Sequence, residues 1–373
     1  MYFDNAATTA PRAEAVAAAL RGMTEVWGNP SSNHPAGRSA NAELSAARKS
    51  VADALGAKPE NIVFTSGGTE ADNLAIFGGA QLRSRHGKHL ITSLAEHSAV
   101  LNAFKRLEKL GYEVTYLEPA RTGAVSPDAL ADALRPDTTL VSLMLVNNET
   151  GAVSPAYEYG KLIRAKAPRA LFHVDAVQAF GKTPFSVKSL GADLISISAH
   201  KIYAVKGAGA LYCASGAALP PLLFGGEQEA GARSGTEALP AIMAFGAAAG
   251  LAVAELADGM NHAARLRRIV TEKLGEIPRF TVIADGIPHI LSISLPGYRS
   301  ETLMNCLEEA GFCLSRSSAC RRGQRSRVLT AMKLPPDVTD GALRVSFGRQ
   351  NTEAEAELFA ETLLEISKKL VHR

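Results

Sequence analysis

The chain has 373 residues, of which 46% are hydrophobic and 21% are charged, a composition that fits a soluble globular protein. This length allows one large domain plus a smaller one. The net charge of +3 is too small to predict nucleic acid or a membrane surface as the main partner. The first residues, Met1-Tyr-Phe-Asp-Asn5, contain neither the basic nor the apolar region of a signal peptide, so we expect a cytoplasmic protein.

Helix and strand signals alternate over the first two thirds of the chain, which is the pattern of an α/β fold. In chain order the predicted elements are helices at 13–27 and 38–55, strand 61–65, a helix ending near 83, strand 89–92, helix 98–110, strand 112–117, helix 127–134, strand 140–146, helix 157–166, and strands 170–174, 194–198 and 208–213. We expect the last of these strands to be an antiparallel neighbour of the one before it, or an edge strand.

The remaining third has a different pattern. The uncharged stretch 238–254 is rich in Ala and Gly, contains Pro240 and is short for a bilayer, so we expect a helix packed inside the protein. From about residue 261 the predicted elements are a long charged helix, strands 280–283 and 290–295, helix 301–310, strand 343–346 and a terminal helix from 352. These elements indicate a small α+β domain, and a strand at 2–4 could belong to either part.

The four cysteines do not predict a metal site. They are Cys213, Cys306, Cys313 and Cys320, and they include no CxxC pair. Gly311 and the polar residues after Leu314 interrupt any single helix that could align the last three.

The most informative stretch is 193–207. Its apolar run ends at Ser198, as in a buried strand, and is followed at once by His200 and Lys201. A lysine at the mouth of a parallel sheet lies where open α/β folds bind ligands. Partial desolvation there lowers the pKa of the amine and frees its lone pair for Schiff-base chemistry. Alone, this pattern is weak, because most lysines are solvated surface charges.

Residues at the ends of other predicted strands strengthen this interpretation. Ser66-Gly67-Gly68-Thr69 lies between a strand and a helix, a geometry that favours a phosphate, although a plain strand–helix turn has the same pattern. Ser198 and His200 could close the same phosphate site from the far side. Asp175 ends another apolar strand, where a carboxylate can keep a ring nitrogen protonated, as in pyridoxal phosphate enzymes.

Two further residues could hold a pyridine ring. Gln178 follows Asp175 by about one helical turn and could reach a phenolic oxygen. His97 could stack on the ring and exchange protons, although a single histidine at a turn is more often a satisfied structural residue. Several polar features at the ends of strands in one sheet are hard to attribute to chance.

These residues lie within longer motifs that resemble those of NifS/IscS-type cysteine desulfurases, in the class V aminotransferase group. The matching segments are Asp4-Asn-Ala-Ala-Thr-Thr9, Gly28-Asn-Pro-Ser-Ser32, Phe64-Thr-Ser-Gly-Gly-Thr-Glu-Ala-Asp-Asn-Leu-Ala-Ile76, Glu96-His97, Val146-Asn-Asn-Glu-Thr-Gly151, His173-Val-Asp175, Ala199-His-Lys-Ile-Tyr203, Arg233-Ser-Gly-Thr236, Ser318-Ala-Cys320 and Leu343-Arg-Val-Ser-Phe-Gly-Arg349.

The resemblance implies the type I fold of pyridoxal 5'-phosphate enzymes. Residues 13–258 would form a large cofactor-binding domain with a mostly parallel seven-stranded sheet flanked by helices. Residues 1–12 and 259–373 would form a smaller α+β domain, which carries the cysteine loop and the substrate-carboxylate arginine.

The resemblance also implies a cofactor role for each matching residue. Lys201 would hold the cofactor as a Schiff base and move protons, and His97 would stack on the ring and act in proton transfer. Asp175 would pair with the ring nitrogen and Gln178 with the phenolate oxygen. The phosphate would be bound by Gly68, Thr69, Ser198 and His200, joined by Thr236 from the second subunit of a homodimer.

The implied substrate is L-cysteine. Asn148 would lie near cofactor and substrate, and Arg344 would bind the substrate carboxylate through both arms of its guanidinium. Cys320 would attack the substrate sulfur, which gives a persulfide and releases alanine. The sulfur would pass to an acceptor protein, an iron–sulfur cluster assembly scaffold or a thiolation enzyme, with no direct role for nucleic acid or a membrane.

Two features depart from the usual pattern of the family. Five arginines surround Cys320, at positions 316, 321, 322, 325 and 327, where family members usually have a small Ser- and Gly-rich stretch. They could lower the thiol pKa and present a basic face to an acidic acceptor, or they could be solvated loop charges. Ala204-Val205 stands where a Gly-Pro pair is common, which puts the local turn shape in doubt.

The same fold leaves alternatives open. A selenocysteine lyase, another C–S lyase or an aminotransferase would share the cofactor site, and Cys320 alone separates these activities. A degenerate homologue that merely binds a sulfur-transfer protein is a further alternative, against which Lys201, Asp175 and His97 argue.

Overall fold

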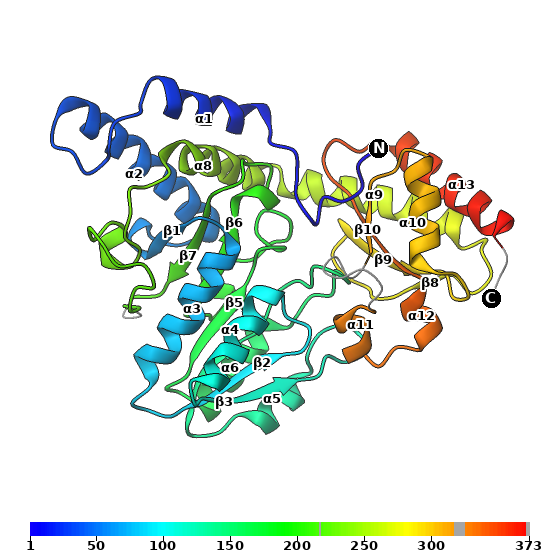
Figure 1. Cartoon of the computed structure of the whole chain (residues 1–373), viewed down its shortest axis with the longest axis horizontal. Coiled ribbons are helices and arrows are strands. Elements are labelled where there is room, and N and C mark those ends of the chain that lie inside the picture. Colours follow the sequence, from blue (N-terminus) through cyan, green and yellow to red (C-terminus); the bar gives the residue numbers. More distant parts are fainter. Residues whose placement is uncertain (216–217, 317–324, 371–373) are drawn as a thin grey trace.

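Two β-sheets organise the chain in a computed structural model that describes residues 1–215, 218–316 and 325–370 (Figure 1). The larger sheet has an apolar core on each face, and the smaller sheet has a core of its own. The larger sheet has seven strands in the order β1-β7-β6-β5-β4-β2-β3. Their bounds are β1 (Ile62–Thr65), β2 (His89–Ser93), β3 (Glu113–Leu117), β4 (Thr138–Ser142), β5 (Leu171–Asp175), β6 (Leu194–Ser198) and β7 (Gly209–Cys213). Strand β7 pairs antiparallel with both neighbours and the other pairs are parallel, as predicted.

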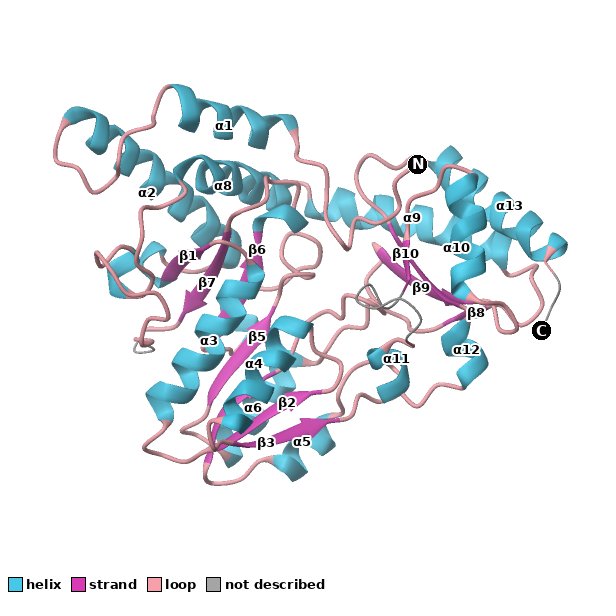
Figure 2. Cartoon of the chain, viewed as in Figure 1, coloured by secondary structure: helices cyan, strands magenta, loops and turns pink. Residues whose placement is uncertain are grey.

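Helices cover both faces of the larger sheet (Figure 2). They are α1 (Ala13–Thr24), α2 (Pro35–Leu55), α3 (Gly68–Arg83), α4 (Ser98–Lys109), α5 (Pro127–Ala133), α6 (Ala156–Lys166), α7 (Val187–Leu190) and α8 (Leu239–Ala254), with short 3-10 helices η1 (Pro59–Asn61), η2 (Ala199–Lys201) and η3 (Glu229–Gly231).

Neighbouring residues along each strand belong to different cores. In β6, Leu194 packs into the core that contains α3 and α4, whereas Ile195 packs into the core that contains α2, α6 and α8. Leu171 and Phe172 of β5 divide in the same way. Because both faces are covered, the strands read as continuous apolar runs rather than as an alternating pattern.

The uncharged stretch forms the buried helix α8, which packs against α1 and α2. The backbones of α2 and α8 approach so closely that a Cβ atom on Gly246 would lie 2.7 Å from Cα of Ala47. Within the described ranges, no single helix is long and apolar enough to cross a membrane, and α8 and α9 pass that test only as a pair bent by 72°.

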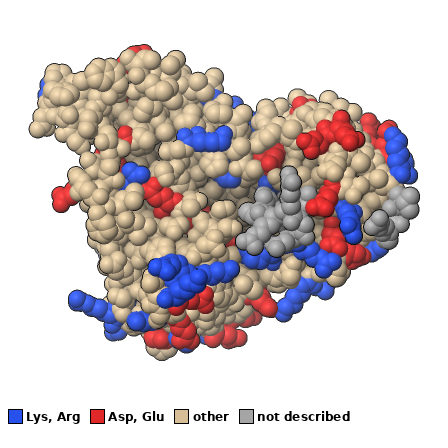
Figure 3. All heavy atoms as spheres, in the orientation of Figure 1, with Lys and Arg blue, Asp and Glu red and all other residues tan. Residues whose placement is uncertain are grey.

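The smaller sheet is antiparallel, with the order β10-β11-β9-β8. Its strands are β8 (Thr281–Val282), β9 (Ile290–Ser294), β10 (Ser315–Arg316) and β11 (Ala342–Ser346), and its helices are α9 (Leu256–Leu274), α10 (Ser300–Glu309), α11 (Arg327–Ala331), α12 (Pro336–Asp340) and α13 (Glu353–Lys369). On the face drawn in Figure 3, acidic and basic side chains both occur over the two lobes, in line with the small net charge.

Several predicted boundaries were wrong by three to five residues. The helix predicted at 13–27 ends at Thr24, and the helix predicted at 38–55 begins at Pro35. Strand β4 ends at Ser142 rather than at 146, because the chain then leaves the sheet for the loop that follows. The long helix α9 begins at Leu256, directly after the bend at Glu255, rather than near 261.

The N-terminal segment joins the smaller sheet through isolated bridges from Tyr2 to Cys313 and from Asp4 to Ser346. Between them, Phe3 is fully buried and packs against three aromatic rings, with centroid distances of 6.1 Å to Phe312, 6.0 Å to Phe347 and 5.4 Å to Phe359. The first residues of the chain are thus part of the core beside its last helix.

We expect Phe3→Ala to lower the free energy of unfolding by about 3 to 5 kcal/mol, the usual cost of removing a buried aromatic ring. Urea denaturation of the wild-type and variant proteins measures this change. Leu358→Ala is the matched control, because Leu358 is next to Phe359 but 48% exposed, and it should cost less than about 1 kcal/mol. Equal effects of the two substitutions would contradict the proposed packing of the N-terminal segment.

Candidate active site

A cavity of about 360 Å³ opens at the edge of the larger sheet where β4, β5 and β6 have their carboxyl ends. This is the position at which open α/β sheets bind ligands. The predicted residues that line it are Gly68, Thr69, His97, Asn148, Asp175, Gln178, Ser198, His200, Lys201 and Arg344. Residues far apart in sequence are therefore brought to one place by the parallel strands.

Lys201 ends the short helix η2, which follows directly on β6. Its Nζ atom donates hydrogen bonds to the carbonyl oxygens of Ala6 at 2.6 Å and Ala7 at 2.7 Å. Burial, together with the positive charge of Arg344, lowers the pKa of the amine to about 8. The amine therefore loses its proton far more readily than a solvated lysine does.

Asp175 is the last residue of β5 and is 5% exposed. Its Oδ1 atom accepts a hydrogen bond of 2.9 Å from the main-chain nitrogen of Val177. Burial raises the pKa of this carboxyl, although the charges of His97 and Lys201 act in the opposite direction. A cationic group beside it would favour the ionised form.

A second carboxyl, Asp72, was missed from the sequence. It lies on α3 one helical turn after Gly68, so it faces the same cavity. Its Oδ1 atom is buried without a hydrogen-bond partner in the described structure, and burial together with the nearby Asp175 raises its pKa well above the usual range. The sequence pattern that could have revealed Asp72 is its spacing of four residues from Gly68 on the same helix.

Gly68 and Ser198 form a polar cradle at the start of α3. A Cβ atom on Gly68 would lie 2.8 Å from Cγ2 of Val177, so a larger residue would not fit. Ser198 is 1% exposed, and its hydroxyl has no partner among the described residues. A buried, unpaired hydroxyl beside the free amides of a helix N-terminus fits an anionic ligand such as a phosphate.

His200 and Gln178 are held by the N-terminal segment. The Nδ1 atom of His200 lies 3.0 Å from Oγ1 of Thr8, and burial lowers the pKa of the ring to about 4. Gln178 donates from Nε2 to the carbonyl of Ala6 at 2.8 Å, whereas its buried Oε1 atom has no partner within the described ranges. A polar ligand in the cavity would satisfy that oxygen.

His97 lies at the N-terminus of α4, and its Nδ1 atom accepts a hydrogen bond of 3.2 Å from the main-chain nitrogen of Ala99. This contact places the proton of the neutral ring on Nε2. Partial exclusion of water by neighbouring groups lowers the pKa of His97, so the neutral ring predominates at neutral pH.

Arg344 reaches the cavity from β11 of the smaller sheet. Its Nη1 atom donates to the carbonyl of Asn148 and its Nη2 atom to Oδ1 of Asp4, both at 2.8 Å. Asp4 also accepts a hydrogen bond of 2.8 Å from Ser315. The orientation of the guanidinium is thus fixed by the N-terminal segment and by a loop of the larger sheet.

The loop that contains Asn148 is organised by a residue that the sequence did not single out. Oδ1 of Asn147 accepts hydrogen bonds from the main-chain nitrogens of Glu149 and Thr150, each at 2.9 Å. Its Nδ2 atom donates to the carbonyl of Ala95 at 3.0 Å. The loop is therefore tied to the segment that carries His97.

Ser326 and Arg327 contact the loops that carry Asn148 and His97. Ser326 donates to the carboxyl of Glu149 at 2.5 Å, and burial raises the pKa of that carboxyl to about 7. Arg327 donates to the carbonyls of Leu94 and Glu96. Arg325 forms a two-armed pair with Asp340, at 2.6 and 2.8 Å.

Two of the five arginines predicted around the cysteine, Arg325 and Arg327, therefore have partners elsewhere. Cys320 itself lies outside the described residues, as do Arg321 and Arg322. Thr236 is exposed and does not line the cavity of its own chain, although the nearby Arg233 binds Glu70 of α3 at 2.8 Å.

Comparisons with known proteins agree with this geometry. A family model described as Aminotransferase class-V matches residues 1–359. A cysteine desulfurase IscS of Methanosarcina thermophila is 43% identical over 375 residues, which covers 99% of this chain and 92% of the relative. A solved NifS-like protein has a TM-score of 0.94 at 36% identity and covers 99% of this chain and 100% of that one.

Another solved structure is described as SspA in complex with cysteine. It has a TM-score of 0.83 at 33% identity, covering 93% of this chain and 98% of that one. These likenesses extend over both sheets and are not confined to the cavity. The chain therefore belongs to the class-V aminotransferase family, within its group of NifS/IscS-type cysteine desulfurases.

Proposed function

We propose that this protein is a pyridoxal 5'-phosphate-dependent cysteine desulfurase, which converts L-cysteine to L-alanine and retains the sulfur on Cys320 as a persulfide for an acceptor protein. The observation that carries the proposal is the buried amine of Lys201, whose pKa is lowered to about 8 in a cavity that also holds Asp175 and the unpaired hydroxyl of Ser198.

The residues of the cavity fit the cofactor. Gly68, Thr69, Ser198 and His200 would bind the phosphate, Asp175 the ring nitrogen and Gln178 the phenolic oxygen, with His97 against the ring. When bound, pyridoxal phosphate supplies an electron-poor ring that stabilises negative charge at the substrate α-carbon. The raised pKa of Asp175 would fall toward its ordinary value beside a protonated ring nitrogen.

Proton transfer would use Lys201 and His97. The lowered pKa of Lys201 lets its amine accept and return a proton near neutral pH. Nδ1 of His97 accepts a hydrogen bond from the main chain of Ala99, so the neutral ring has its proton on Nε2 and can donate it from there. Both groups line one cavity, so they could act on the same substrate.

Arg344 would bind the substrate carboxylate. Its buried Nε atom has no partner in the described structure, and its two terminal nitrogens are held by Asn148 and Asp4. The guanidinium group of Arg344 is therefore oriented before the substrate binds, which lowers the entropic cost of binding.

The thiol of Cys320 would take the sulfur. The C–S bond of cysteine breaks, an S–S bond forms on Cys320, and the former thiol carbon gains a proton, so that alanine and a cysteine persulfide result. The attacking group must be a thiolate. An iron–sulfur cluster assembly scaffold or a thiolation enzyme would then accept the sulfur.

A homodimer completes the proposal. Thr236 is exposed and does not line the cavity of its own chain, as expected of a residue that contributes to the site of the other subunit.

We also propose that residues 13–258 form the cofactor-binding domain. The remainder would then form the domain that carries Arg344 and Cys320.

The lowered pKa of Lys201 predicts the pH dependence of cofactor uptake. Only the neutral amine attacks an aldehyde, so the rate at which cofactor-free protein takes up pyridoxal phosphate should rise about tenfold per pH unit below pH 8 and level off above it. Absorbance of the Schiff base measures the rate. Free Nα-acetyl-lysine, the control, should continue to gain rate up to about pH 10. A protein profile that follows this control would contradict the assigned environment.

Incubation with L-cysteine tests the function itself. We expect one alanine for each sulfur transferred, and a protein mass increased by one sulfur atom at Cys320. Cys320→Ala should keep the cofactor absorbance but form neither product catalytically. A variant that still released sulfide at the wild-type rate would identify a lyase instead.

A further inference from the structure

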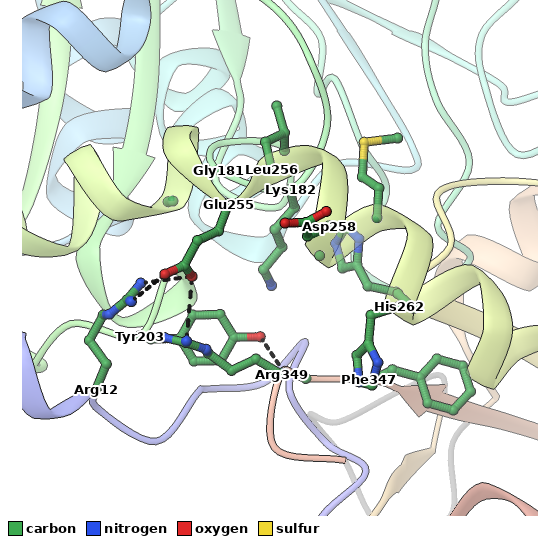
Figure 4. Close-up of a pocket in the computed structure, with 16 residues that line it drawn as sticks. Arg12, Gly181, Lys182, Tyr203, Glu255, Leu256, Asp258, His262, Phe347 and Arg349 are labelled. Atoms are coloured by element: carbon green, nitrogen blue, oxygen red, sulfur yellow. Dashed lines mark hydrogen bonds and ion pairs between the residues drawn. The ribbon is translucent and has the colours of Figure 1, made fainter. Parts of the chain in front are cut away.

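A second cavity of about 360 Å³ lies between the two sheets, and none of the described residues lines both this cavity and the candidate active site. Its lining comes from the turn at Lys182 after β5, the bend between α8 and α9 at Glu255, Arg12 before α1, Tyr203 after η2, His289 before β9, and Phe347–Arg349 after β11 (Figure 4). Its volume is that of a small-molecule site.

Lys182 points its amine into this cavity (Figure 4). The side chain is only 8% exposed, and Nζ has no hydrogen-bond partner within the described ranges. Burial, followed by the positive charge of Lys201, lowers the pKa of this amine to about 7. A buried cation without a partner is costly, and a bound anion would relieve that cost.

The two arginines of the cavity are already paired. Arg12 donates to Glu255 at 2.8 Å and to Glu14 at 3.0 Å, and Arg349 lies 3.4 Å from the same Glu255. Asp258 also lines the cavity, but it is exposed and makes no ion pair with Lys182 in the described part of the chain. Among the described lining residues, the three cations Arg12, Lys182 and Arg349 face the two carboxylates Glu255 and Asp258, so one positive charge is in excess.

A neutral polar group and an apolar wall complete the lining. His289 is 7% exposed, its Nε2 atom lacks a partner among the described residues, and burial lowers the pKa of the ring well below its ordinary value. The ring is therefore neutral, and because it donates to the main chain of Gln178, its free Nε2 atom is a hydrogen-bond acceptor. The apolar wall consists of Ala252, Leu256, Met260, Ala263 and Phe347.

We propose that this cavity binds a small organic carboxylate, with the carboxylate on Lys182 and the apolar body against the wall formed by α8, α9 and Phe347. One excess cation matches a single negative charge, and the apolar wall favours an organic acid over inorganic phosphate. The site goes beyond the proposed function, because neither the cofactor nor the carboxylate site at Arg344 uses any of these residues.

Calorimetric titration of the holoenzyme with benzoate tests this proposal. Benzamide is the neutral probe of the same shape. We expect benzoate to bind, benzamide to bind at least tenfold more weakly, and Lys182→Met to weaken benzoate at least tenfold. Lys182→Arg, which keeps the charge, should retain binding.

Arg344→Gln separates the two cavities. It should not weaken benzoate binding, because the two cavities share no lining residue among those described and loss of the Arg344 charge raises the pKa of Lys182. The proposal would be overturned if Arg344→Gln lost benzoate binding while Lys182→Met kept it. It would also be overturned if the wild-type protein bound benzamide as tightly as benzoate, or did not bind benzoate at all.

Thermal unfolding keeps the proposal testable if Lys182→Met folds poorly. Without ligand, we expect this variant to melt at a higher temperature than the wild type, because an unpaired buried amine is removed. A lower melting temperature would show that Lys182 has a structural partner and would contradict the proposal. Ala263→Leu, which fills the apolar wall without changing charge, should also weaken benzoate, and unchanged affinity would count against the site.

Discussion

The structure depends most on the exclusion of water from the amine of Lys201. That amine lies at the carboxyl end of β6, under the carbonyl oxygens of Ala6 and Ala7. The N-terminal segment thus covers the lysine and also supplies the acceptors that hold it. Desolvation lowers its pKa to about 8, and the neighbouring guanidinium of Arg344 acts in the same direction. A reactive amine near neutral pH follows from this burial.

The same segment connects the two sheets. Phe3 packs in the core of the smaller sheet, Asp4 holds Arg344, and the carbonyl of Ala6 binds both Lys201 and Gln178. Substrate and cofactor groups are therefore positioned relative to one another by a few consecutive residues. Arg344 and the amine of Lys201 are both held by contacts with the same segment.

Local patterns (apolar strands, a glycine-rich turn and polar strand ends) predicted the strands of the larger sheet and most residues of its cavity, whereas Asn148 and Arg344 were expected only from the family resemblance. Asp72, Asn147 and Glu149 were missed, since their roles depend on burial between elements that are distant in sequence. The end of β4 was also misplaced, because apolar residues continue beyond Ser142 into a buried loop. Lys182 could not be distinguished from a surface lysine, since its environment is created by the packing of one sheet against the other.

Two buried amines with lowered pKa values, Lys201 and Lys182, are candidates for reaction with an aldehyde. Only Lys201 shares a cavity with Asp175, Ser198 and Gly68. Reduction of the protein with borohydride in the presence of pyridoxal phosphate, followed by peptide mass mapping, decides between them. We expect a pyridoxyl group on Lys201 alone, as the assignment of the cofactor site requires. A label on Lys182, or on neither residue, would contradict it.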